Sequence, residues 1–160
     1  MSGWIYEPRI RVGLLNFNSS IDEISAKFHL RFAGDLNELY KETFDDSERF
    51  CEDGVGESWG LEDYLDDFGF FKVKLEFNEN GLLETICDAE SFVFLGSEII
   101  GLPESDLSVC FGKPEEIVKI PHFNAFSLYV FNDDIMVSIL NGRVDRITVS
   151  SYSIPSDFSF

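Results

Sequence analysis

The chain has 160 residues and a mass of 18.2 kDa, which is the length of one domain. Apolar residues make up 44% and aromatic residues 15%, enough for a packed core, so general disorder is excluded. Thirty acidic residues against 12 basic ones leave a net charge of −18. This balance excludes an ordinary nucleic-acid binder and docking on anionic lipid, since both need clustered Lys and Arg, and it favours a basic partner.

The ends and the cysteines point to the cytoplasm. The first residues lack the basic and apolar regions of a secretory signal, and no apolar run approaches the roughly 18 residues of a membrane span. Cys51, Cys87 and Cys110 are odd in number and widely spaced. We expect reduced thiols in a cytoplasmic protein with no metal site and no cofactor.

The first expected elements are a strand and a helix. Apolar residues between positions 4 and 12 predict an edge strand, because Pro8 cannot donate a ladder hydrogen bond. Ser20 followed by Glu23 has the spacing of a capping box. The apolar positions after it fall on one helical face, which predicts a short helix over 21–28.

An acidic segment follows. Residues 35–67 contain 13 acids and 2 bases, a net charge of −11, whereas the rest of the chain carries −7. Apolar residues recur at helical spacing in 36–44 and in 61–68. We therefore predict a helical insertion at about 31–70 with its acids facing solvent, in which the Gly-rich stretch 52–60 joins two amphipathic helices. Trp59 would lie in that joining loop.

The remaining segments have the pattern of strands and hairpins. Strict apolar and polar alternation over 71–77 predicts a strand, and Asn80-Gly81 predicts the turn after it. A further strand is expected at 92–95. Residues 126–149, which include Asn141-Gly142, predict a three-stranded meander. A second short helix is expected between Pro103 and Gly112.

These segments form two related halves. A shift of 83 residues aligns the first helical region with the second, and the pattern N-G-x-[LV]-[DE]-x-I occurs at 80–86 and 141–147. We predict an α+β fold in a single domain, 1–160, built from two unequal helix-plus-meander repeats over 1–90 and 91–160. The sheet would be mainly antiparallel, with the helices on one face.

The side chains that commonly catalyse reactions are scarce in this sequence. We therefore expect that the protein is not an enzyme and has no catalytic residue. His29 and His122 are the only histidines, Cys51 has no basic surroundings to lower its pKa, and no phosphate-binding or dinucleotide motif occurs. Paired acids, such as Asp133-Asp134, are mostly solvated carboxylates in this interpretation. An acid-pair hydrolase and weak binding of a divalent cation remain open alternatives.

The crowded acids are the candidate binding site. Eleven net charges within 33 residues repel one another, and a basic partner would relieve that repulsion and be attracted faster. Trp59, flanked by acids, is a candidate aromatic anchor, or else a lid over the local core. A solvated face that only prevents aggregation is the alternative. The candidate partner-binding residues are Asp45, Asp46, Glu48, Glu52, Asp53, Glu57, Trp59, Glu62, Asp63, Asp66 and Asp67.

The repeat layout resembles the β-lactamase inhibitor protein and the related small outer-membrane assembly lipoproteins. That resemblance implies a sheet with helices on one face and a concave opposite face that grips a partner protein. In its acidity and aromatic content the chain is also similar to cytoplasmic immunity proteins of bacterial toxin systems, including contact-dependent growth inhibition. This implies an inhibitor that occludes the active site of a basic toxin domain, such as a nuclease. A protein-binding adaptor and an acidic nucleic-acid mimic are the alternatives.

Overall fold

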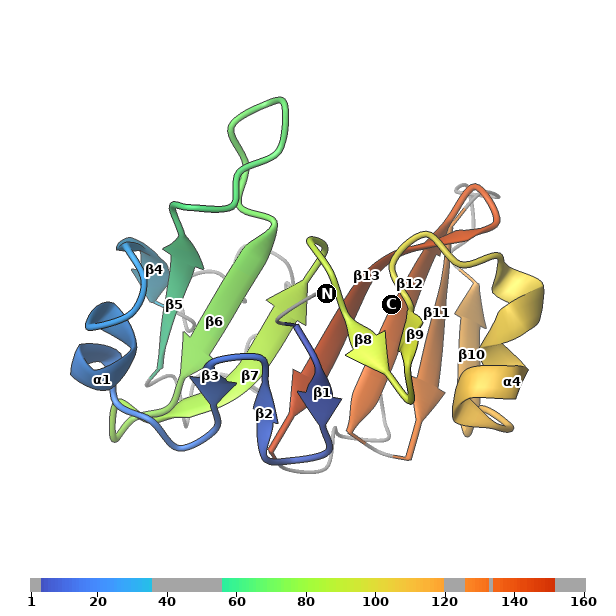
Figure 1. The fold of residues 1–160 in the computed structure, drawn as a ribbon, viewed down its shortest axis with the longest axis horizontal. Coiled ribbons are helices and arrows are strands. Elements are labelled where there is room, and N and C mark those ends of the chain that lie inside the picture. Colours follow the sequence, from blue (N-terminus) through green and yellow to red (C-terminus); the bar gives the residue numbers. More distant parts are fainter. Residues whose placement is uncertain (1–3, 36–55, 120–125, 133, 152–160) are drawn as a thin grey trace, which may run out of the picture. The chain divides into compact units, whose positions relative to one another are not determined.

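The structure is a computed structural model that describes residues 4–35, 56–119, 126–132 and 134–151 (Figure 1). Within these residues the chain forms mainly antiparallel strands, two short α-helices and one 3-10 helix. It divides into two compact units. We call Phe17–Ile86 the continuous unit, and Met1–Asn16 together with Cys87–Phe160 the split unit.

The continuous unit contains one helix and a run of strands in chain order. The helix α1 is followed by strands whose hydrogen-bonded order is β7-β6-β5-β4. The bounds are α1 Ile21–Ser25, β4 Leu30–Asp35, β5 Glu57–Leu61, β6 Val73–Phe77 and β7 Leu83–Asp88. The last two residues of β7 belong to the split unit. Both neighbours of β5 run antiparallel to it, and Trp59 lies opposite Phe32 on β4 and Leu75 on β6.

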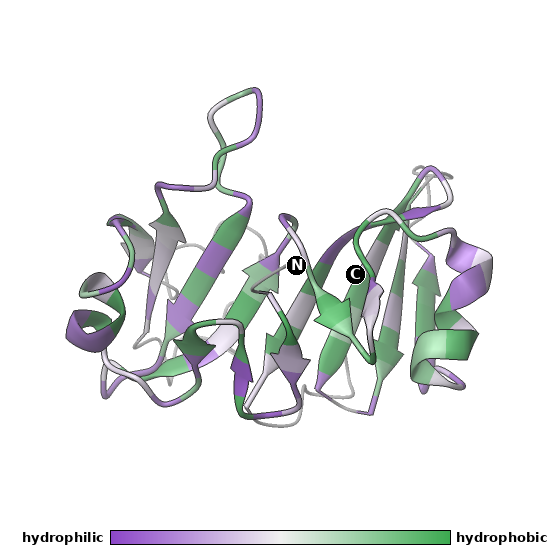
Figure 2. Ribbon diagram, viewed as in Figure 1, coloured by the Kyte–Doolittle hydropathy of each residue, from purple (hydrophilic) through white to green (hydrophobic). Residues whose placement is uncertain are grey.

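Local sequence signals explain α1 and β6. The Ser20 side chain accepts a hydrogen bond from the Glu23 amide, and the Glu23 carboxylate accepts one from the Ser20 amide, so the predicted capping box is confirmed. On β6 the apolar residues are buried and Lys74 between them is exposed, which confirms the predicted alternation (Figure 2). The buried residues of this unit include Ile24 on α1, Leu61 on β5 and the apolar residues of β6.

The split unit contains the remaining elements. Its bounds are β1 Tyr6–Glu7, β2 Arg11–Val12, β3 Leu15–Asn16, β8 Val93–Phe94, β9 Ser97–Glu98, η1 Glu104–Asp106, α4 Leu107–Phe111, β10 Glu116–Lys119, β11 Phe126–Phe131, β12 Ile135–Leu140 and β13 Arg143–Ser150. Three antiparallel pairings join β10, β11, β12 and β13 in chain order. The predicted meander over 126–149 is therefore confirmed, as is the helix that ends at Gly112.

Stacked aromatic rings hold the split unit together. The ring of Phe111 on α4 stacks on Phe94 of β8 at 5.3 Å between centroids and on Phe131 of β11 at 5.1 Å. Tyr6 of β1 lies 4.9 Å from Phe92 and 5.6 Å from Phe94. These contacts join the N-terminal hairpin, the β8–β9 hairpin and the helix into one core.

The prediction of a helix over 61–68 is wrong. Glu57–Leu61 is the strand β5, and the residues after it form turns. The residues whose apolar spacing indicated a helix do not lie on one buried face. Leu61 is buried in the sheet, whereas Phe68 is exposed. Pairing with two distant strands stabilises β5 and overrides the local spacing. The other predicted helix, 36–44, lies outside the described residues.

Three smaller corrections concern the N-terminal and helical segments. Residues 4–12 form a hairpin of β1 and β2 instead of one strand, since Pro8 lies in the turn between them. The helix predicted over 21–28 ends at Ser25, so His29 lies just before β4. The strands β4 and β10 were not predicted, because neither segment alternates strictly between apolar and polar residues in the sequence.

Replacing Gly60 by Ala should destabilise the continuous unit. A Cβ atom at this position would lie 2.3 Å from the Phe71 ring, and a rigid ring packed on a strand cannot move away cheaply. We expect Gly60→Ala to lower the free energy of unfolding in urea by about 1–3 kcal/mol. The control is Gly60→Ala combined with Phe71→Ala, which should cost less than the sum of the two single changes. Additive costs would contradict the packing described here.

Candidate functional site

The segment between β5 and β6 forms an ordered loop, which we call the 62–72 loop. It projects beyond the ends of both strands (Figure 1). The Asp66 amide donates to the Phe70 carbonyl at 2.8 Å, and the Lys72 amide donates to the Tyr64 carbonyl at 2.9 Å. Leu65 and Phe71 form an antiparallel bridge between the two arms. These bonds close the loop upon itself, so its conformation is fixed by its own backbone.

The carboxylate of Asp66 fixes the tip of the loop. Its Oδ1 accepts hydrogen bonds from the Phe68 amide at 2.8 Å and from the Phe70 amide at 2.9 Å. Gly69, between them, has a φ of +85°, which other residues adopt at a cost. The side chain therefore satisfies two amides that the reversal would otherwise leave to solvent, as Asp commonly does in turns.

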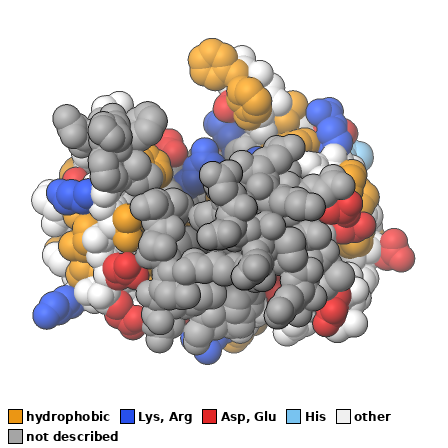
Figure 3. All heavy atoms as spheres, turned by 180° about the vertical axis from the view of Figure 1, so that it is seen from behind, with side chains coloured by type: hydrophobic (Ala, Val, Ile, Leu, Met, Phe, Trp, Pro, Cys, Tyr) orange, Lys and Arg blue, Asp and Glu red, His pale blue; other side chains and the backbone are white. Residues whose placement is uncertain are grey.

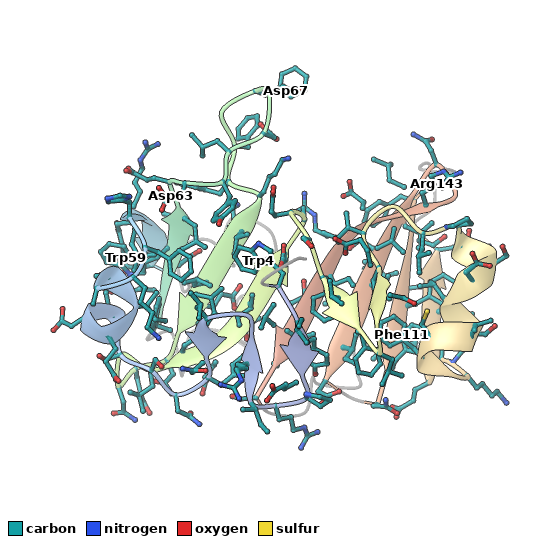
Figure 4. The ribbon with its side chains drawn as sticks, viewed as in Figure 1. Trp4, Trp59, Asp63, Asp67, Phe111 and Arg143 are labelled. Carbon is teal, nitrogen blue, oxygen red and sulfur yellow. The ribbon has the colours of Figure 1, made fainter. Side chains whose placement is uncertain are left out.

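Two aromatic side chains stand exposed at this tip. Phe68 is 84% exposed and Phe70 is 69% exposed. Asp67 lies beside them at the end of the loop (Figure 4). Hydrophobic side chains are seen gathered at the projecting end of the loop, with charged ones below (Figure 3). Exposed rings on a fixed backbone form an apolar contact surface that needs little ordering when it binds.

The base of the loop is attached to β4 and β5 through Phe71. Its ring covers Gly60, and the guanidinium of Arg31 lies 5.4 Å from the centroid of the same ring. Arg31 Nε also donates to Glu62 Oε1 at 2.7 Å. One arginine thus contacts both ends of the loop, while Glu62 is partly neutralised by it.

His29 and Asp63 form a second attachment between the loop and β4. Asp63 Oδ1 lies 2.9 Å from His29 Nδ1, and Asp63 Oδ2 accepts from the His29 amide at 3.2 Å. Hydrogen bonding to Asp63 and its charge raise the pKa of His29, and the same hydrogen bond lowers the pKa of Asp63. The ordinary pKa values are about 4 for Asp and about 6.5 for His, so at a pH between these values both side chains of the pair are charged.

Trp59 lies on β5, and the expectation that it sits in a loop is wrong. Its indole N–H donates to Glu57 Oε1 at 3.2 Å, and its ring meets Phe32 edge-on at 5.4 Å between centroids. Phe32, on β4, is 48% exposed and Trp59 is half-buried. Trp59 is therefore part of the packing of the sheet surface and offers less free area than the rings of the 62–72 loop.

The predicted site residues divide into two groups, those that the structure describes and those that lie outside the described residues. Glu57, Trp59, Glu62, Asp63, Asp66 and Asp67 all belong to β5 and the 62–72 loop, and Trp59, Asp63 and Asp67 are labelled there in Figure 4. Of these, Glu62 and Asp63 are exposed, as expected, and each also pairs with a basic group of this chain. Asp45, Asp46, Glu48, Glu52 and Asp53 lie outside the described residues.

Sequence reasoning missed Phe68 and Phe70 as site residues. Phe68 was assigned to the apolar stripe of a helix, although it is one of the most exposed hydrophobic residues described. The signal that identifies them is the run Asp66-Asp67-Phe68-Gly69-Phe70, in which Asp and Gly occupy turn positions. That turn signal conflicts with a continuous helix.

Buried acids of the split unit serve the fold. Asp88 is fully buried and accepts from the amides of Glu90 and Ser91, and burial raises its pKa to about 7. Asp134, which was expected to be a solvated carboxylate, is buried and forms an ion pair with Arg9 at 2.9 Å. Asp88 thus orders the turn that follows β7, whereas Asp134 connects two segments that are distant in sequence.

Comparison with protein-family models, with curated proteins and with solved structures found no match to this chain. Among the described residues, no three His, Cys, Asp or Glu side chains are grouped in a way that could hold a metal ion. Nor does that part of the chain contain a helix long and apolar enough to cross a membrane.

Two substitutions of Asp66 should separate its structural role from its charge. Asp66→Ala removes the acceptor, so the amides of Phe68 and Phe70 should exchange with solvent about tenfold faster, which corresponds to about 1.4 kcal/mol for the lost bonds. Asp66→Asn keeps an acceptor oxygen and should retain most of the protection. Hydrogen exchange followed by NMR measures both, and equal exchange in the two variants would show that the carboxylate does not order the loop.

The pairing of His29 with Asp63 should appear as a pKa difference. In Asp63→Asn the pKa of His29 should fall towards its ordinary value, because the hydrogen bond to a charged acceptor is lost. Asp67→Asn removes the same charge from the exposed tip and is the matched control. Since the folded pKa of His29 is raised, its contribution to stability is full below about pH 6.5 and is lost as the pH rises through the folded pKa. An imidazole titration that is the same in all three proteins would contradict the pairing.

Proposed function

We propose that this chain is a non-enzymatic inhibitor of the immunity-protein kind, which binds a basic toxin domain in the cytoplasm and occludes its active site. A nuclease domain is the expected partner. The observation that carries the proposal is the 62–72 loop, a conformation fixed by Asp66 that exposes Phe68 and Phe70 beside carboxylates. Such a combination of aromatic anchors and charge is typical of protein interfaces.

The distribution of charge supports a basic partner. The continuous unit, which carries the loop, contains 18 acids and 6 bases, a net charge of −12 out of −18 for the whole chain. The basic groups that pair with Glu62 and Asp63 reduce the contribution of these two acids to the outward field. The net field of this unit remains negative and accelerates encounter with a positive surface.

The two exposed rings would supply a large part of the binding energy. Complete burial of a Phe side chain contributes about 1.5–3 kcal/mol, so the pair accounts for a large part of a specific interface. A loop ordered before binding avoids much of the entropic cost that a flexible one incurs. Charge would therefore govern the rate of association, and the rings its lifetime.

The order of elements supports the tandem-repeat layout that the proposal includes. In the continuous unit α1 is followed by β4, β5, β6 and β7, and in the split unit α4 is followed by β10, β11, β12 and β13. In each unit the last two strands are joined through an Asn-Gly pair. We propose that residues 1–90 and 91–160 are related repeats, each with its helix on one face of its own strands, as in the β-lactamase inhibitor protein.

Removing the rings should weaken partner binding without unfolding the chain. The test partner is whichever basic C-terminal toxin domain is found encoded next to the gene of this chain, and its affinity is measured by titration calorimetry. The double variant Phe68→Ser, Phe70→Ser should bind at least about tenfold more weakly, given the apolar area lost. Its thermal midpoint should be unchanged, because both rings are exposed. Val109→Ser on α4, also 84% exposed, is the matched control and should bind normally.

Measurements of toxin activity and of competition with DNA distinguish an inhibitor from an adaptor and from a nucleic-acid mimic. An inhibitor should also abolish the activity of the toxin domain and protect cells that express it. An adaptor would bind without inhibiting, and a nucleic-acid mimic would compete with DNA for several unrelated proteins. Unchanged affinity in the double variant, or no binding to any encoded basic domain, would contradict the proposal.

A further inference from the structure

The turn of the β8–β9 hairpin places a leucine in a left-handed backbone conformation. Phe94 pairs with Ser97, so the turn consists of Leu95 and Gly96 alone. Their φ angles are +51° and +82°. Two-residue hairpins with positive φ at both positions favour Asn, Asp or Gly at the first one. A leucine there is strained, because its Cβ approaches its own backbone.

The same chain provides an unstrained version of this turn. Asn141 and Gly142 join β12 to β13 with φ angles of +54° and +79°. The two turns therefore have nearly the same backbone angles but different first residues. Among the described residues with positive φ, Leu95 is the one large apolar side chain, and three of the others are Asn.

The strain at Leu95 is not balanced by packing within the chain. Its side chain is 79% exposed, whereas the core of the split unit consists of residues that are almost fully buried. An exposed leucine gains little from the fold, and Asn at this position would be both more soluble and less strained. Strained residues that the fold does not require are found at functional positions.

The base of the hairpin is held firmly, so the tip is a rigid projection. The Val93 amide donates to the Trp4 carbonyl at 2.9 Å, and the Phe92 amide donates to Glu98 Oε2 at 2.7 Å. The ring of Phe94 stacks on Phe111 at 5.3 Å between centroids. Leu95 is thus carried by a turn whose two strands are fixed to the aromatic core.

We propose that Leu95 is an apolar anchor that inserts into a hydrophobic pocket on the basic partner domain. This inference rests on the proposed function for its partner, but it concerns a contact in the split unit that is separate from the 62–72 loop. The pocket it fits is small, of the size of one leucine side chain. Because the chain as a whole carries a net charge of −18, the rim of the pocket is expected to be cationic.

The test compares stability with binding in two reciprocal variants. Leu95→Asn should raise the thermal midpoint by about 2–4 °C, because it relieves the backbone strain. It should also weaken binding to the basic domain about tenfold or more, because the buried leucine is lost. Asn141→Leu introduces the same strain at the matched turn. It should lower the thermal midpoint by a similar amount and leave binding unchanged.

The outcomes separate this inference from the proposed function. Unchanged affinity in Leu95→Asn, while Phe68→Ser, Phe70→Ser binds weakly, would overturn the anchor alone. A thermal midpoint that does not rise in Leu95→Asn would overturn the argument from strain. Absence of binding by the unmodified chain would overturn the proposed function itself. Sedimentation of each variant without partner is the final control, since a change of mass would assign Leu95 to self-association and overturn the inference.

Discussion

The contact of the Phe71 ring with Gly60 is the constraint on which the candidate site depends. Because residue 60 has no Cβ, the ring lies directly on the backbone of β5. The ring in turn receives the guanidinium of Arg31, which also pairs with Glu62. One close approach of backbone and side chain thereby connects the sheet with both ends of the 62–72 loop. The tip can project into solvent and still keep one conformation, because its base is packed.

The acidic residues of this region have different physical roles, although their composition is uniform. Asp66 uses its charge to accept two amide hydrogen bonds within the loop. Glu62 and Asp63 face Arg31 and His29, so part of the local repulsion is compensated by the chain itself. Asp67 lies exposed at the tip. The fold tolerates these crowded carboxylates in part because several of them form hydrogen bonds or ion pairs within the chain.

The two proposed contacts combine stability and binding in opposite ways. At the 62–72 loop, the interactions that order the backbone also position the rings, so stability and recognition agree. At the β8–β9 hairpin, Leu95 is proposed to bind the partner, but it strains the backbone of the turn in which it lies. Natural proteins retain such conflicts where a function requires them, because the rest of the fold supplies the stability that is lost.

The features of this protein that the sequence by itself determined are those that depend on interactions between neighbouring residues. The Ser20 capping box, the alternation over β6 and the Asn-Gly turns involve neighbouring residues, so their outcome was predictable. Only the tertiary structure decided the course of residues 57–72 and the exposure of Phe68 and Phe70. There β5 pairs with the described strands before and after it along the chain, and Phe71 packs across Gly60. Such contacts leave no periodic signal, because a residue's spacing along the chain does not specify which strand it will meet.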